Sequence, residues 1–275
     1  MSAPDQNDFS RLLAAEAVAL RAGMLALDYF RSTGLERLHK GPQNFVSEAD
    51  IEVESLIRET IIKVFPEDSL LGEEDGLQAG SSGYTWVIDP IDGTTNFLDG
   101  LPGWVVSVAV LKDDIVEVGV IQDPCAGEIF TAHRGGGTRL NGRLLPPLKD
   151  GNLSSGTVGI GFPQNADPDE FANFVGDLLK DGGNFYRNGS AASMLAQVAA
   201  GRLVAAYQSH LNSWDCLAGL LLIEEVGGKV LNYDMATMLK HGAPVLGAAP
   251  KAFEQILRLV SDNWNTSGSD CHFVK

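Results

Sequence analysis

Cysteine is scarce in this sequence. Cys125, Cys216 and Cys271 are the only cysteines among 275 residues, and they form no Cys-x-x-Cys pair. An odd and sparse set of this kind indicates a reducing compartment, with neither a disulfide framework nor a zinc site. The N-terminal stretch also lacks the basic start of a signal peptide. We therefore expect a cytoplasmic protein.

Basic residues are also few. Lysine and arginine total 20 against 36 aspartates and glutamates, which leaves a formal charge of −16. Because the phosphate backbone of nucleic acids attracts basic surfaces, this balance argues against direct nucleic-acid binding. The excess of acid either serves solubility or reflects carboxylates that bound cations neutralise.

Long hydrophobic runs are missing as well. No apolar run approaches the roughly 18 residues of a membrane-spanning helix, so we expect no membrane partner. Apolar residues nevertheless make up 44% of the sequence, which is ample for a packed core. The nucleophile motif Gly-x-Ser-x-Gly does not occur, which argues against catalysis through a covalent serine intermediate.

Residues 8–32 carry apolar side chains at helical spacing. The apolar positions are Phe9, Leu12, Leu13, Ala17, Leu20, Met24 and Leu27. We interpret this stripe as the buried face of a helix, and Arg11, Glu16 and Arg21, which lie off it, as the solvated face. A second helix is predicted to begin near Ser47.

The middle of the chain changes to strand-like periodicity. Residues 104–123 contain two β-branched runs separated by residues 112–114, which predicts a hairpin. The glycine-rich segment 134–142 could pass for a phosphate-binding loop. It lacks the Gly-Lys-Ser/Thr ending and lies among hairpins, so we interpret it as a turn between strands.

The second half of the chain alternates strands with helices, which is typical of α/β proteins. Strands are predicted at 157–162, 202–208, 228–233 and 243–249, and helices at 169–180, 190–201, 213–228 and 251–262. We expect an N-terminal α+β half at 1–148, a C-terminal α/β half at 149–264 and a flexible tail at 265–275.

The segment WVIDPIDGTTNFLDG, residues 86–100, combines two aspartates with small polar residues. Asp89 ends a strand-like run, Pro90 stops the strand by removing a donor, and Asp92 follows near the start of a short helix. Two carboxylates and an intervening carbonyl can converge there on a hard divalent cation such as Mg²⁺.

The next residues add an anion site. Gly93 lets the backbone approach a ligand closely, and the amides of Gly93 and Thr94 point outward at a helix start. The competing interpretation is a helix cap followed by a turn, without any ligand. We favour a cation site beside a phosphate site for the full DPIDGTTN motif.

Four more acids accompany this motif, namely Glu73, Glu74, Asp50 and Asp215. The two glutamates follow a short apolar strand, and the two aspartates lie in the first turns of predicted helices. Each has a simple structural explanation when taken alone, as a surface turn or as a charge that complements a helix dipole. Glu224 and Glu225, later in the 213–228 helix, are assigned to a solvated face.

The segments LLGEED (70–75), WVIDPIDGTTNF (86–97) and WDCLAGLLLIEEVGG (214–228) together resemble the inositol monophosphatase family of magnesium-dependent phosphatases. The resemblance extends over about residues 8–262. It implies an α/β (α+β) fold, a layered αβαβα sandwich of the inositol monophosphatase and fructose-1,6-bisphosphatase type. It also implies a lithium-sensitive homodimer that acts on a small phosphorylated substrate.

The same resemblance implies a set of metal ligands. Glu73, Asp89 and the carbonyl of Ile91 would bind one Mg²⁺. Asp89, Asp92 and Asp215 would bind a second, and Glu73 would share a third, loosely held ion. Water activated by the metal would attack the phosphoryl group in line, without a covalent intermediate.

The resemblance further implies which residues act on phosphate and water. Gly93, Thr94 and Thr95 would bind the phosphate. Thr94, paired with Asp50, would position the attacking water, and Glu74 would assist from behind the metal ligands. Gly189, Ser190, Ala191, Gln208 and Asp215 would contact the substrate.

Three positions depart from the family pattern. Asn44 and Val204 stand where aspartates are common, and Gln208 replaces a glutamate that receives inositol hydroxyls. Glutamine still accepts and donates hydrogen bonds, but it brings no charge.

Inositol 1-phosphate is the leading substrate, and histidinol phosphate or another sugar or alcohol phosphate is the alternative. Residues 95–97, Thr-Asn-Phe, disfavour the adenosine bisphosphate branch, where Lys-Glu-Phe is usual.

A hypothesis of another class stays open. Some bacterial members of the family use this fold to contact the transcription machinery, and an acidic surface could suit a basic protein partner. A complete ligand set predicts turnover of phosphomonoesters, whereas a purely regulatory protein would be inert. The two roles can coexist.

Overall fold

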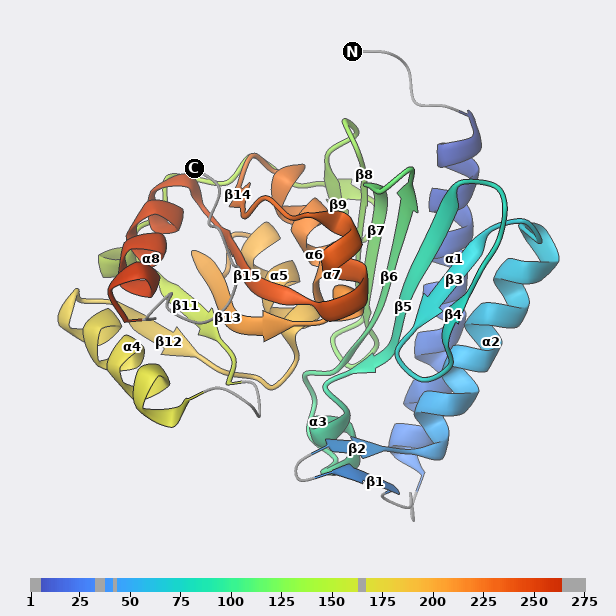
Figure 1. Cartoon of the computed structure of the whole chain (residues 1–275), viewed down its shortest axis with the longest axis horizontal. Helices are drawn as coiled ribbons and strands as arrows, with labels where there is room; N and C mark the ends of the chain where they lie inside the picture. Colours follow the sequence, from blue (N-terminus) through green and yellow to red (C-terminus); the bar gives the residue numbers. More distant parts are fainter. Residues whose placement is uncertain (1–5, 33–37, 42–43, 163–166, 264–275) are drawn as a thin grey trace.

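A computed structural model describes residues 6–32, 38–41, 44–162 and 167–263. The predicted tail at 265–275 lies outside these residues. Across the described residues, helices and sheets alternate in five layers, which confirms the predicted αβαβα sandwich (Figure 1). None of the helices in this part of the chain combines the length and apolar content needed to cross a membrane.

The first two layers come from the N-terminal half. Two helices, α1 (Gln6–Arg31) and α2 (Glu48–Val64), cover the outer face of an eight-stranded sheet. In spatial order its strands are β10 (Arg143–Leu144), β9 (Thr138–Leu140), β8 (Glu128–His133), β7 (Ile115–Asp123), β6 (Val105–Lys112), β5 (Tyr84–Asp92), β3 (Ser69–Gly72) and β4 (Gly76–Gln78). A small separate hairpin is formed by β1 (Leu38–Gly41) and β2 (Asn44–Val46), and the short α3 (Thr94–Leu98) follows β5.

The remaining layers come from the C-terminal half. The helices α5 (Ala191–Ala199) and α6 (Ser213–Glu224) lie between the large sheet and a five-stranded sheet. That sheet has the order β12 (Asn184–Tyr186), β11 (Thr157–Ile160), β13 (Ala205–Leu211), β15 (Ala243–Ala248) and β14 (Lys229–Val230). Its outer face is covered by α4 (Pro168–Lys180) and α8 (Pro250–Asn263), while α7 (Met235–His241) follows β14.

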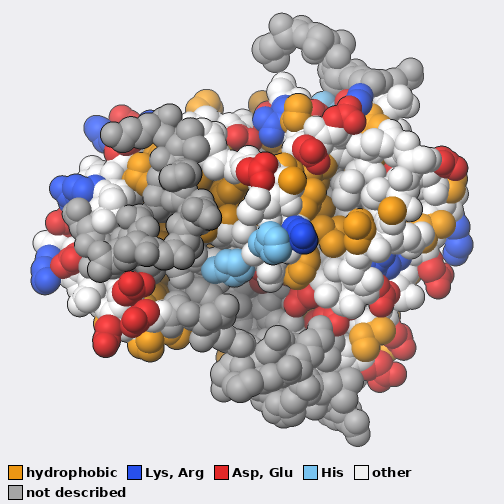
Figure 2. Space-filling model, viewed as in Figure 1, with side chains coloured by type: hydrophobic (Ala, Val, Ile, Leu, Met, Phe, Trp, Pro, Cys, Tyr) orange, Lys and Arg blue, Asp and Glu red, His pale blue; other side chains and the backbone are white. Residues whose placement is uncertain are grey.

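Apolar side chains hold the layers together. The central hydrophobic cluster joins residues of the large sheet, such as Val87 and Phe130, with Leu195 of α5 and Leu221 of α6. This cluster draws on both predicted halves, whose boundary at 148/149 stays a prediction. On the face shown in Figure 2, acidic side chains are spread over the surface and are not gathered in one patch.

The interpretation of the first helix is wrong. The side chains of Phe9, Leu13, Leu20 and Met24 are exposed, and the buried apolar side chains of α1 are those of Ala15, Val18, Ala19, Ala22 and Ala26. Small side chains let the helix lie close to the sheet. A Cβ atom at Gly23 would lie 1.5 Å from Gln122 Oε1. The apolar periodicity of α1 indicates which side chains lie on one stripe of the helix, but it does not show which stripe is buried. In α1 the stripe of small side chains is buried, because it allows close packing against the sheet.

The interpretation of Glu225 as part of a solvated face is also wrong. Its two carboxylate oxygens each accept a backbone N–H, at 2.8 Å from Gly135 and at 2.8 Å from Gly137. The glycine-rich segment is a turn between β8 and β9, as predicted. The amides of Gly135 and Gly137 in this turn bind a carboxylate of the protein itself and not a phosphate.

Candidate active site

The candidate site begins where β5 ends. The strand continues through Pro90 to Asp92, beyond the end predicted from sequence, with an irregular register against β6 between Asp89 and Asp92. Such a bulge redirects side chains. Both carboxylates are buried, and Asp89 Oδ1 accepts the Ile91 N–H at 3.0 Å.

A third carboxylate arrives from a distant part of the chain. Asp215 lies in the first turn of α6, where it accepts the Asn212 N–H at 2.9 Å in a capping box. Carboxylate oxygens of Asp89, Asp92 and Asp215 all lie within 4.8 Å of one another. Helix α6 therefore closes the site by packing against the large sheet.

The electrostatics of this acid cluster, Asp89, Asp92 and Asp215, favour a bound cation. Burial and then repulsion by neighbouring acids raise the pKa of Asp89 well above its ordinary value. Burial raises the pKa of Asp92 to about 6 and, together with repulsion by Asp92, that of Asp215 to about 7. The two buried carboxylates of Asp89 and Asp92 and the half-buried carboxylate of Asp215 repel one another, and they form a donor set suited to hard divalent cations such as Mg²⁺.

Removing metal should therefore make stability depend on pH. The pKa values of Asp50, Asp92 and Asp215, about 6, 6 and 7, exceed their ordinary value of 3.8. Between pH 3.8 and about pH 7 the metal-free folded protein binds more protons than the unfolded chain. The free energy of unfolding of the metal-free protein therefore falls as the pH rises through this range. We expect Mg²⁺ to raise the Tm more at pH 8 than at pH 5. Thermal unfolding with Mg²⁺ and with EDTA at both pH values measures this, and equal shifts would contradict it.

The two glutamates lie beside the cluster. Repulsion by Glu73 contributes to the raised pKa of Asp89, and repulsion by Glu74 contributes to that of Asp50. The turn that carries Glu73 and Glu74 is held by Glu54 of α2. The sequence patterns did not indicate this role for Glu54. Its oxygens accept the N–H groups of Glu74 at 2.9 Å and of Asp75 at 3.1 Å. A fully buried acid on a predicted helix gave no sequence signal apart from its charge.

We expect Glu54→Gln to weaken Mg²⁺ binding. Glutamine places an amide donor where carboxylate oxygens receive two backbone N–H groups and the Arg58 Nε–H, the last at 2.7 Å. The Mg²⁺ concentration for half-maximal activity should rise by about 10- to 100-fold, with a smaller change in turnover at saturating Mg²⁺. The matched control is Glu59→Gln, an exposed position on the same helix. An unchanged Mg²⁺ requirement in Glu54→Gln contradicts the positioning role.

Thr94 lies next to Asp50. Its Oγ1 is 3.3 Å from Asp50 Oδ1 and 3.1 Å from the Ile91 carbonyl. Asp50 in turn accepts the N–H of Ser47 at 2.8 Å and its hydroxyl at 2.7 Å. Gly93 precedes α3 with a φ of 102°, and a Cβ there would lie 3.0 Å from the Gly103 carbonyl. Both the backbone conformation and the space at this position require glycine.

The predicted substrate residues 189–191 are tied to the acid cluster. Ser190 is buried, and its hydroxyl donates to Asp92 Oδ2 at 2.6 Å, as does the Ala192 N–H at 2.6 Å. Asn96 Nδ2 donates to the carbonyls of Gly103 and Asn188, which joins the DPIDGTTN segment to the loop before α5. Gly189 is exposed, whereas Ala191 is buried.

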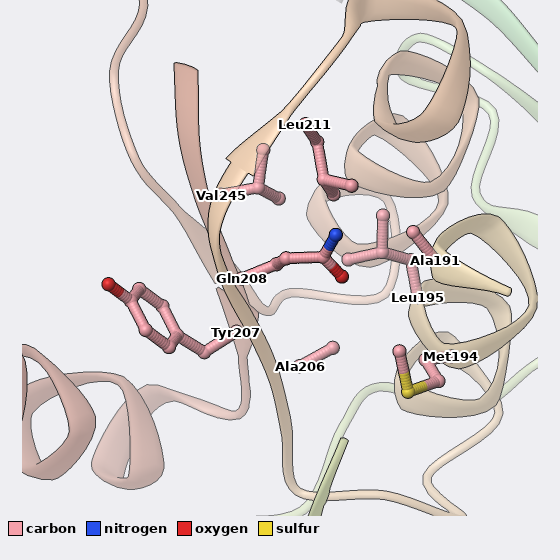
Figure 3. A pocket seen from close by; sticks show the side chains of 8 residues that line it. All are labelled: Ala191, Met194, Leu195, Ala206, Tyr207, Gln208, Leu211 and Val245. Carbon is pink, nitrogen blue, oxygen red and sulfur yellow. The ribbon is translucent and has the colours of Figure 1, made fainter. Parts of the chain in front are cut away.

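Gln208 lies in a small apolar pocket on β13. Its amide points toward Ala191 and Leu195 (Figure 3), and its Nε2 donates to the His210 carbonyl at 3.4 Å. The pocket has a volume of about 10 Å³. That is room for about one water molecule. Val204, which stands where the family commonly has an aspartate, directly precedes β13 and is half-buried.

The five layers and the acid cluster define a class of layered α/β proteins whose carboxylates could hold hard divalent cations. The chain belongs to the inositol monophosphatase family, whose family model matches residues 8–265. It is 38% identical over 253 residues to "Nus factor SuhB" of Escherichia coli K12, covering 91% of this chain and 95% of that protein.

Solved structures agree with this family. The extragenic suppressor protein suhB from Bartonella henselae superposes with a TM-score of 0.85 at 28% identity, covering 94% of this chain and 100% of that one. The Thermotoga maritima IMPase gives a TM-score of 0.81 at 27% identity, with 92% and 97% covered. The family and the fold predicted from the motifs are thus confirmed.

The expectation that limited the partners to a small phosphorylated substrate and a second copy of the chain, and that excluded direct contact with nucleic acid, is wrong in that restriction. Curated relatives are named as Nus factors, a name that belongs to the transcription machinery. Net charge misled because it averages over the whole surface and does not describe a local binding face.

Proposed function

We propose that this protein hydrolyses a small phosphomonoester in a Mg²⁺-dependent reaction. The observation that carries the proposal is the convergence of Asp89, Asp92 and Asp215 within 4.8 Å. Membership of the inositol monophosphatase family supports it. When bound, Mg²⁺ would lower the pKa of a water molecule and stabilise charge on the phosphoryl oxygens.

The proposed ligands follow the predicted set. Asp89, Asp92 and Asp215 hold one ion, and Asp89, Glu73 and the Ile91 carbonyl hold another. The repulsion between Glu73 and Asp89 supports placing both beside the same charge. A third ion at Glu73 remains part of the proposal.

Neighbouring residues position water and phosphate. Thr94 directs its hydroxyl hydrogen toward Asp50 or the Ile91 carbonyl, so its oxygen lone pairs are available to orient a water. Glu74, whose charge raises the pKa of the neighbouring Asp50, is proposed to help position the water from behind the metal ligands. The first amides of a helix have no intrahelical acceptor. Those at Gly93, Thr94 and Thr95 are accordingly proposed to bind the phosphate.

Inositol 1-phosphate is the proposed substrate, and histidinol phosphate or another sugar or alcohol phosphate is the alternative. Gly189, Ser190 and Ala191 are proposed to line the substrate pocket. Ser190 would act through Asp92, to which its hydroxyl donates. Gln208 lacks the charge of the family's glutamate, which favours a substrate with fewer hydroxyl donors at that position.

A phosphate-release panel tests the function. Inositol 1-phosphate, histidinol phosphate, fructose 1,6-bisphosphate and adenosine 3′,5′-bisphosphate are each incubated with purified protein, with and without Mg²⁺. We expect Mg²⁺-dependent release from at least the first or the second. No release from any of them, in a protein that folds and binds Mg²⁺, would sink the proposal.

A regulatory role is the second candidate, because curated relatives at 33–38% identity carry the name "Nus factor SuhB". Binding of the purified chain to a purified transcription elongation complex tests it. Binding by a protein that is inert across the substrate panel favours regulation alone, whereas binding together with turnover favours both roles. The cytoplasmic location and the homodimer stay predictions.

A further inference from the structure

A second cluster of metal-ligating side chains lies on the opposite face of the large sheet from α6. Asp8 on α1, Glu117 on β7 and His133 at the end of β8 each place one ligand atom within 4.8 Å of the others. They meet because α1 packs against β7 and β8. The register between β6 and β7 is irregular around Glu117, and such a bulge redirects a side chain.

His133 is the observation that points to a ligand. Its side chain is only 7% exposed, and its Nε2 is buried without a hydrogen-bond partner among the described residues. A buried nitrogen without a hydrogen-bond partner destabilises a fold, so a ligand bound there would be stabilising. Asp8 is also 7% exposed, whereas Glu117 is half-buried and connects the cluster to solvent.

The hydrogen bond from Tyr84 and the contact with Lys112 involve only one of the two carboxylate oxygens of Asp8. Asp8 Oδ1 accepts the Tyr84 hydroxyl at 2.7 Å and lies 4.0 Å from Lys112 Nζ, which leaves Oδ2 for another ligand. The Lys112 side chain is 35% exposed, so its ammonium can turn toward water. Arg134, the other nearby cation, pairs with Glu224 at 3.1 Å.

The donor set selects the metal. One imidazole and two carboxylates suit Zn²⁺, which binds nitrogen and oxygen ligands and often keeps water as a fourth ligand, whereas Mg²⁺ prefers oxygen alone. Ligand atoms about 2.1 Å from a tetrahedral ion lie about 3.4 Å apart, so atoms that lie within 4.8 Å of one another need to approach by at most about 1.4 Å. The expectation of no zinc site rested on cysteine, and these ligands contain no sulfur.

We propose that Asp8, Glu117 and His133 bind one Zn²⁺ ion, separate from the acid cluster. The ion fastens the first turn of α1 to the ends of β7 and β8. The ion gives the buried His133 nitrogen a bonding partner. It also neutralises the carboxylates of Asp8 and Glu117, which the packing of α1 on the sheet brings close together.

The test is a Zn²⁺ titration of the chelator-treated full-length protein in a large excess of Mg²⁺, which occupies the acid cluster. We expect one equivalent of Zn²⁺ to bind, and Co²⁺ in its place to show visible d–d absorption. His133→Gln should weaken Zn²⁺ binding by about 100-fold or more, and it should leave Mg²⁺-dependent phosphate release unchanged. His241→Gln, which removes an exposed histidine, is the matched control and should bind like the parent.

Glu117→Gln is the second variant, in case His133→Gln folds poorly, and it should weaken binding in the same direction. Equal Zn²⁺ affinity in the parent and in either variant overturns the proposal. So does a Zn²⁺ equivalent that excess Mg²⁺ displaces, because that ion would occupy the acid cluster. Neither result bears on the proposed phosphatase function, which is measured without Zn²⁺.

Discussion

Replacing Asp92 by asparagine should lower phosphomonoester turnover by about 1,000-fold or more. A bound metal contributes several kcal/mol of transition-state stabilisation, and each 1.36 kcal/mol is tenfold in rate. Asp92 shares one small volume with Asp89 and Asp215. Losing one of three carboxylates removes a ligand and one negative charge from that volume.

The variant should nevertheless fold. Asp92 Oδ2 accepts the Ser190 hydroxyl and the Ala192 N–H, and the asparagine Oδ1 can accept both. Loss of a repelling buried charge also favours the metal-free folded state, so its Tm should match or exceed that of the parent in EDTA. Steady-state phosphate release at saturating Mg²⁺ and thermal unfolding measure the two effects.

Asp123→Asn is the matched control. Asp123 is a buried aspartate at the end of β7 whose pKa is raised by burial, and it lies outside the acid cluster. Turnover by this variant should stay within a few-fold of the parent. If Asp92→Asn retains full turnover, the assignment of the acid cluster to a metal is wrong.

Replacing Asp68 by alanine should destabilise the protein by about 3–5 kcal/mol, the usual effect of breaking a buried ion pair. Asp68 accepts hydrogen bonds from Arg11 Nε and Nη2, each at 2.8 Å, from Ser82 Oγ at 2.6 Å and from Trp86 Nε1 at 2.8 Å. Burial by itself would raise the pKa of Asp68, but these donors outweigh it and lower the pKa. Alanine leaves the buried guanidinium of Arg11 without its counter-charge.

Denaturant unfolding of single and double variants measures this effect. Arg11→Met combined with Asp68→Ala removes the orphaned charge and should recover part of the lost stability. Glu254→Ala breaks an exposed pair with Lys229 and should change stability by about 0–1 kcal/mol. A similar small change in Asp68→Ala would show that the Arg11 pair does not anchor α1.

The acid motif at residues 89–92 shows which contacts of the candidate site can be predicted from residues that are close in sequence. Asp89 and Asp92 are three residues apart, so their proximity follows from the backbone of one strand end. The pairing of Thr94 with Asp50 was expected from the family resemblance, and the atoms lie 3.3 Å apart. Glu54 could not be found in this way, because its partners are backbone amides about 20 residues away on another element.

For the first helix, the sequence pattern predicted the position of the element but not the face that is buried. Periodicity located α1 to within two residues, but it selected the wrong face. Arg11 was assigned to solvent, and the structure buries it against Asp68. Which face of a helix is buried depends on the shape of the sheet beneath it and on partners far along the chain. A single sequence does not contain that information in any local pattern.

The sequence by itself determined the order of most elements, the family and the positions of the proposed metal-binding motifs. These depend on periodicity and on residues a few positions apart, which the chain carries whatever it packs against. The family resemblance had already grouped Asp215 with Asp89 and Asp92, and the tertiary structure brings their oxygens within 4.8 Å of one another. Only the tertiary structure decided that α1 lies on its small residues and that Asp8, Glu117 and His133 meet. Burial and repulsion between charges depend on distance through space, and packing of the layers sets that distance.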